Sequence, residues 1–131
     1  MNILAYIREI IINDELIKNH VSNRIYFYEV SENADTTKPF IILSPVADSP
    51  SSFASDKYLS ETFTIQVDVE SYKDQSTIDI TKRVRYLLKE YGFFQASSVI
   101  DAYFKQTKRY VKSKRYEGIP KSKYYKGERV E

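Results

Sequence analysis

The sequence predicts an α+β fold: a mostly antiparallel sheet of about five strands with helices packed on one face. Residues 63–69 alternate strictly between apolar and polar side chains, which is the period of a strand with one buried face. Residues 80–91 carry apolar side chains at helical spacing. One sheet with helices on a single face would bury all the apolar stripes of the chain. The predicted order of elements is α-α-β-β-β-α-β-β.

Two helical segments open the chain. Residues 2–12 carry isoleucine and leucine at helical spacing and predict a first helix. Asn13 and Asp14 can end this helix and cap a second, short helix that carries Leu16 and Ile17.

Two strands are predicted next. Residues 24–30 are rich in β-branched and aromatic side chains, which favours a strand. Residues 31–38 are polar and predict a loop, and Pro39 opens a second strand over residues 40–46. The apolar run at residues 40–43 indicates cover on both faces, as in a central strand.

A serine-rich segment at residues 48–57 joins the second strand to the long third one, which predicts an antiparallel hairpin with a long tip. Ser51 and Phe53 are candidate interface residues at this tip. A lone phenylalanine there can anchor a partner, or it can fold back onto the sheet.

The third helix follows the alternating strand. Its apolar positions are Ile80, Val84, Leu87, Leu88 and Tyr91. Ser76 with Asp79 resembles a capping box at its start, and Gly92 is a natural residue to end it.

Two more strands are predicted near residues 100–105 and 109–116. The last of them has one aliphatic residue, Val111, among many charges, which predicts an edge strand kept soluble by charge. We expect a single domain over residues 1–118. Residues 119–131 are expected to form a basic, tyrosine-containing tail that is loose or ordered by a partner.

Composition excludes several classes of site. The chain has no cysteine, which removes disulfides and thiol nucleophiles. The N-terminus lacks the basic start of a signal peptide, and the apolar runs are too short to span a bilayer, so no membrane association is expected. Residues 1–104 carry ten Lys/Arg and fifteen Asp/Glu, whereas residues 105–131 carry ten and three. An acidic body with a basic end favours a charged partner or self-association, or simply gives a solvated tail.

The sequence has few residues in arrangements typical of catalytic sites. His20 is the one histidine, and a lone histidine near a helix end is usually structural. No serine lies in a nucleophile turn, and three scattered glycines do not form a phosphate-binding loop. Asp68 and Glu70 share a strand face and could bind a divalent cation, although a polar strand face explains them more simply. We therefore expect no enzyme activity, no cofactor or metal site and no small-molecule substrate.

The basic end supplies the remaining candidate interface residues. They are Lys105, Arg109, Tyr110, Lys112, Lys114, Arg115 and Tyr116. Three interpretations stay open: protection of a sheet edge, an interface with an acidic protein or another copy of the chain, and nucleic-acid binding by phosphate contacts and base stacking.

Several short segments occur in a recognisable order. They are RIYF at residues 24–27, KPFIIL at 38–43, ETFTIQVDV at 61–69 and KRYVKSKRY at 108–116. With a helical start, a serine-rich hairpin and an amphipathic helix, this order resembles the tail-completion proteins (tail terminator or tail-to-head joining proteins) of long-tailed phages and prophages of Gram-positive bacteria.

The resemblance implies a non-enzymatic virion protein that is assembled in the host cytoplasm, ends the tail tube and joins the tail to the head. It implies a hexameric ring around a DNA channel, with the tail tube protein and head connector proteins as partners. The family has no catalytic residues to carry over, and the matching positions, such as Pro39, Phe40, Arg109 and Tyr110, are structural. The basic extension from Gly118 departs from the pattern. The alternative function is a nucleic-acid-binding module that uses the basic C-terminal region.

Overall fold

The computed structural model of the 131-residue chain describes residues 2–50 and 61–120. Its elements are α1 (Ile3–Ile12), α2 (Glu15–Val21), β1 (Ile25–Phe27), β2 (Phe40–Pro50), β3 (Glu61–Ser71), α3 (Asp74–Glu90), β4 (Phe93–Phe104) and β5 (Arg109–Gly118). This order confirms the α-α-β-β-β-α-β-β prediction. Ser51, Phe53 and residues 121–131 of the expected tail lie outside the described residues.

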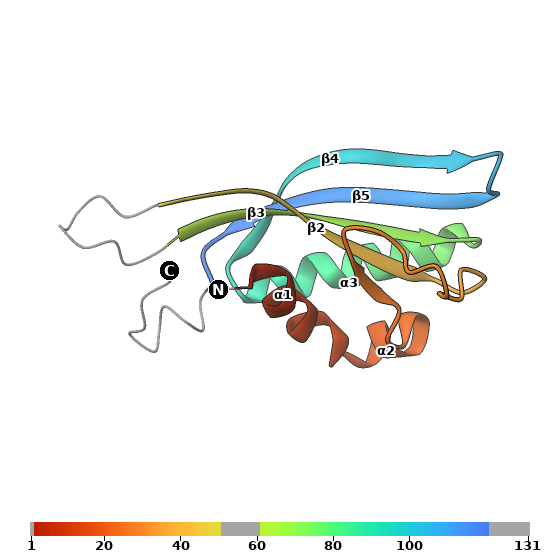
Figure 1. Ribbon diagram of the computed structural model, residues 1–131, viewed down its shortest axis with the longest axis horizontal. Coiled ribbons are helices and arrows are strands. Elements are labelled where there is room, and N and C mark those ends of the chain that lie inside the picture. Colours follow the sequence, from red (N-terminus) through yellow and green to blue (C-terminus); the bar gives the residue numbers. More distant parts are fainter. Residues whose placement is uncertain (1, 51–60, 121–131) are drawn as a thin grey trace.

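The five strands form one sheet in the order β1-β2-β3-β5-β4. All neighbouring strands are antiparallel except β1 and β2, which are parallel, so the sheet is mostly antiparallel as predicted. In Figure 1, α1 and α2 lie below the sheet, and the β4–β5 hairpin forms the upper margin of the sheet, away from these helices. The strand β5 is therefore not an edge strand: it lies between β3 and β4, and the prediction of a charged outer edge is wrong.

The core lies between the helices and one face of the sheet. The alternating side chains of β3 contribute Ile65, Val67 and Val69, all almost completely buried. They belong to one cluster with Ile7 of α1 and Val84 of α3, so the apolar stripes recognised in the sequence do meet. The described helices are too short or too polar to cross a membrane.

Side-chain caps fix the first two helices where the sequence predicts them. Asn13 is the C-cap of α1, and Asp14 is the N-cap of α2. The Asp14 carboxylate accepts a hydrogen bond from the Ile17 backbone N–H at 3.2 Å. This oxygen satisfies one of the N–H groups that a helix start leaves without a partner.

The third helix begins earlier than the capping box predicts. Its N-cap is Lys73, which contributes no side-chain acceptor, so Ser76 and Asp79 already lie inside the helix. The Ser71 hydroxyl instead accepts a hydrogen bond from the Lys73 N–H at 2.8 Å and shapes the turn before the helix. At the other end Gly92 has a φ of 89°, which confirms it as the residue that follows the C-cap.

Strand β4 is longer than the sequence predicts, because it starts at Phe93 rather than near residue 100. Residues 96–99 are exposed small or apolar side chains without a buried face. Pairing with β5 holds this half of β4 in the sheet, with irregularities of register between Gln95 and Ser97 and between Ser98 and Ile100. Such a strand has no alternating pattern of its own for sequence reasoning to detect.

Candidate assembly surface

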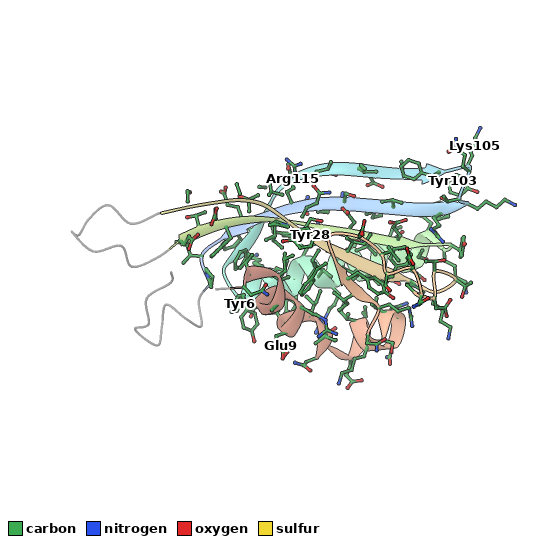
Figure 2. All side chains as sticks on the ribbon, in the orientation of Figure 1. Tyr6, Glu9, Tyr28, Tyr103, Lys105 and Arg115 are labelled. Carbon is green, nitrogen blue, oxygen red and sulfur yellow. The ribbon has the colours of Figure 1, made fainter. Side chains whose placement is uncertain are left out.

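The β4–β5 hairpin carries all seven candidate residues that the structure describes. Lys105 lies in the exposed turn between the two strands, and the other six lie in β5. Figure 2 shows Lys105 and Tyr103 at one end of the hairpin and Arg115 further along it. The turn is closed by a hydrogen bond from the Lys108 N–H to the Phe104 carbonyl at 2.7 Å.

Tyr116 belongs to the core and not to an exposed interface. It pairs with Ile65 of β3 on the helix-covered face, and only 1% of its surface is exposed. Burial of the phenol raises its pKa to about 12. Beside the aliphatic Val111, β5 therefore supplies a large aromatic side chain to the core.

Lys112 and Lys114 converge on one carboxylate of the neighbouring strand. The Lys112 Nζ lies 2.6 Å from Asp101 Oδ1, and the Lys114 Nζ lies 3.7 Å from Asp101 Oδ2. Lys114 also donates to the Ser98 hydroxyl at 2.7 Å and is largely buried. The hydrogen bond from Lys112 lowers the pKa of Asp101. These two lysines thus act mainly inside the hairpin, and they are not a free strip of positive charge.

A ring pair extends this cross-strand cluster toward the turn. The Tyr103 and Tyr110 ring centroids lie 4.8 Å apart in a tilted arrangement. Pairs of this kind add about 0.5–1.5 kcal/mol beyond their area burial. The hairpin is therefore held together by its own side chains as well as by its backbone ladder.

Arg109 and Arg115 lie on the opposite face of β5, as the alternation predicts. The Arg109 guanidinium lies over the rings of Phe40 at 5.5 Å and Tyr72 at 5.1 Å. It also donates to the Thr36 carbonyl at 3.4 Å, so it ties the segment before β2 to the sheet. Arg115 donates to the Gln66 side chain at 3.1 Å. Both arginines already have partners within the chain.

Asp68 and Glu70 share this same face, as predicted. Gln66 donates to the Asp68 carboxylate at 3.0 Å. Glu70 lies opposite Phe40 on one side and Val111 on the other, and burial raises the pKa of its carboxyl group. No group of three histidine or acidic side chains suited to a metal ion occurs among the described residues.

The outer strand β4 is the feature of this surface that sequence reasoning missed. It is 12 residues long, pairs with β5 on one side only, and has one charged residue, Asp101. Its exposed large apolar side chains are Phe94, Val99, Tyr103 and Phe104. Natural edge strands are usually short, charged or covered, because free N–H and C=O groups recruit other strands. A long edge with so little charge has the properties of a docking edge.

A second open edge lies at the other margin of the sheet. Strand β1 has three residues and pairs only with residues 41–43 of β2. Residues 44–50 of β2 therefore pair with β3 alone. From the pairings, β2 and β4 run in opposite directions. The two open edges thus have different sequences and antiparallel directions.

Comparison with known proteins shows that this fold occurs in solved structures. No protein-family model matches the sequence, and no curated protein matches it. A chain of a solved structure titled "Virion of native gene transfer agent (GTA) particle" has the same fold, with a TM-score of 0.61. The match covers 89% of this chain and 92% of that chain at 9% sequence identity. At this identity the likeness is one of fold.

Proposed function

We propose that this chain is a non-enzymatic structural protein of a phage-like virion. The observation that carries the proposal is the fold match to a chain of a gene transfer agent virion, which extends over nearly the whole of both chains. The order of short segments that resembles tail-completion proteins supports the same class independently. The more specific role is that of a neck protein that ends the tail tube and joins the tail to the head.

The two open sheet edges could pair between neighbouring copies of the chain and so form a ring. If copies are arranged with their strands along a common axis, β4 of one copy meets residues 44–50 of the next copy in antiparallel sense. Backbone hydrogen bonds would then continue the sheet from copy to copy, with no donor from Pro45 and Pro50, which lack a backbone N–H. Because the edges differ, the contact is head-to-tail, and such contacts close into a ring when the rotation per copy allows it. A hexameric ring is the form that we propose.

The proposed partners follow from this role. A ring at the end of a tail meets the tail tube protein on one side and head connector proteins on the other, with DNA passing through its channel. The nucleic-acid-binding alternative is not favoured by β5, where Lys112 and Lys114 share Asp101.

Electron microscopy of particles that lack the protein tests the role. Deletion of the gene should give heads and tails that are not joined and tails of irregular length. Tails of normal, uniform length attached to heads would refute the proposal.

The assembly edge can be tested separately on the purified chain. Val99→Lys places a charge on the exposed edge, and Tyr91→Lys is a matched control at an exposed position after α3. Analytical ultracentrifugation should show oligomers for the wild type and Tyr91→Lys, and monomers with an unchanged melting curve for Val99→Lys. Equal assembly of both variants would exclude this edge from the interface.

A further inference from the structure

A polar hollow lies where α2, the segment before β2 and the β3–α3 connection meet. Its volume is about 590 Å³. Its lining residues include Ser71 at the end of β3, the strand end that lies on the right in Figure 1. Four basic side chains line it, namely His20, Arg24, Lys38 and Lys73, and none of its lining residues is acidic. These four residues come from three separate parts of the chain.

Arg24 is held in a fixed orientation within the wall of the hollow. Its Nε donates to the Pro39 carbonyl at 2.9 Å, and its Nη2 donates to the His20 carbonyl at 2.9 Å. Because a guanidinium has five N–H donors, these two bonds leave others for a ligand. The positive charge is therefore positioned in advance, which lowers the entropy cost of binding.

The positive charge of the hollow is not cancelled by ion pairs. In the described part of the chain, salt bridges join Arg83 to Asp14 and the two hairpin lysines to Asp101, and none involves Arg24, Lys38 or Lys73. Asp35 interacts electrostatically with Lys38 and Arg24 and offsets part of their charge, but it does not line the hollow, and its Oδ1 accepts hydrogen bonds from the Thr37 hydroxyl and backbone N–H.

The first turn of α3 adds to the same potential. Ser76 of this turn lines the hollow, and the N-cap residue Lys73 offers no side-chain acceptor to the N–H groups of the turn. Those groups carry partial positive charge at the start of a 17-residue helix. The same turn carries Asp74, which does not line the hollow but offsets part of this potential, so the basic side chains remain the main source of positive charge.

We infer that this hollow binds a phosphate-bearing anion. Three cationic side chains around one site, Arg24, Lys38 and Lys73, favour a group with more than one negative charge, which a terminal phosphate carries near neutral pH and a single carboxylate does not. The volume lies in the range of small-ligand sites and exceeds what one inorganic ion fills. Guanidinium and ammonium donors with nearby hydroxyl groups suit phosphate oxygens. The phosphate belongs either to a free polyphosphate compound or to a nucleic-acid backbone.

The test uses the full chain and two probes at about 50 mM salt, where phosphate contacts are strong. Pyrophosphate binding is measured by calorimetry, and binding of a labelled DNA duplex by fluorescence anisotropy. The test variant is Lys38→Gln/Lys73→Gln, whose side chains are exposed. The control is Lys82→Gln/Lys89→Gln, which removes the same charge from the exposed face of α3. Melting curves show that each variant is folded.

The wild type and the control should bind at least one probe, and the test variant should bind it about tenfold more weakly or worse. Loss of pyrophosphate binding alone identifies a free phosphate compound. A weaker duplex affinity whose salt slope falls by about 2 identifies a nucleic-acid backbone. Absence of binding to both probes by the wild type, or equal weakening in the control, would overturn the inference.

Discussion

Asp14 makes two stabilising interactions whose contributions to the free energy of unfolding can be separated by mutation. Its carboxylate caps α2 through Ile17, and it also accepts hydrogen bonds from Arg83 of α3, at 3.0 Å from Nε and 2.7 Å from Nη2. Its own side chain is 8% exposed, and that of Arg83 is 38% exposed. Asp14→Ala removes both interactions, whereas Asp14→Asn keeps an oxygen that can cap the helix and removes the charge.

The expected losses follow from this geometry. A lost N-cap costs about 1 kcal/mol. The ion pair contributes about 1 kcal/mol, because Arg83 is partly solvated and screened. Asp14→Ala should therefore lower the free energy of unfolding by about 2 kcal/mol and Asp14→Asn by about 1 kcal/mol. For a chain of this length, each kcal/mol lowers the melting temperature by roughly 3–5 °C.

The loss should also depend on pH. The hydrogen bond from Arg83 is the main cause that lowers the pKa of Asp14 in the folded protein. A lowered pKa gives stability that is fully present above the unfolded value, near 4, and is lost as the pH falls through the folded value. The stability curves of the wild type and Asp14→Asn should therefore be parallel at neutral pH and converge in acid.

Urea denaturation followed by circular dichroism measures both effects. Glu9→Gln is the control, because Glu9 is an exposed side chain on α1, and it should change the free energy of unfolding by less than about 0.5 kcal/mol. A loss for Asp14→Ala no larger than that of Glu9→Gln would refute the reasoning. So would a difference between wild type and Asp14→Asn that stays constant down to about pH 3, because the loss should already have begun below the unfolded pKa of about 3.9.

Three further outcomes are expected. Gly118→Ala should lower the free energy of unfolding by about 1–3 kcal/mol, because the new Cβ would lie 2.0 Å from the Gly92 carbonyl oxygen; urea denaturation that shows no loss would contradict the close approach. Val67→Asp should abolish the cooperative melting transition, since it buries an unpaired charge in the core; an unchanged melt would mean that the face assignment is wrong. Absorbance titration at alkaline pH should show one tyrosine with a pKa of about 12 that is missing in Tyr116→Phe. Because folding raises the pKa of this phenol, the contribution of Tyr116 to stability should be lost as the pH rises from the unfolded pKa through 12. A titration curve that Tyr116→Phe leaves unchanged would contradict the burial of this phenol.

The elements predicted well from the sequence are those whose pattern of apolar and polar side chains matches their buried and exposed faces. β3 and α3 each bury one face, and their periods of two and of 3.6 residues are written into the chain. The first half of β4 buries almost nothing after Phe93, so it has no period to detect. The start of α3 was misplaced because Lys73 caps it without a recognisable capping side chain.

In the candidate site, too, some features could be predicted from the sequence and others could not. The alternation of side chains along a strand places Lys112 and Lys114 on one face of β5 and Arg109 on the other, as the register shows. Their partners could not be predicted, because Asp101 reaches the lysines only through the register of the β4–β5 hairpin. The basic hollow lacks any local signal, since its residues come from separate segments and meet only in the folded chain.

Acidic and basic residues are separated along the sequence, but the fold does not keep them separated in space. The basic strand β5 lies inside the sheet between the acidic β3 and the outer strand β4, and its Lys112 and Lys114 are paired with Asp101. The basic hollow, whose lining cations form no ion pair in the described part of the chain, is built from the N-terminal part of the sequence, which has the net negative charge.

This separation predicts that salt weakens binding at one of the two proposed surfaces and not at the other. Assembly through β4 uses backbone hydrogen bonds and exposed apolar side chains, which 1 M NaCl should not weaken. Anion binding in the hollow depends on unpaired cations, and screening over about 3 Å at 1 M salt should abolish it. Sedimentation and pyrophosphate binding, each measured in low and in high salt, check this contrast. Dissociation of the oligomer by salt would mean that charged side chains, and not the strand edges, hold the copies together.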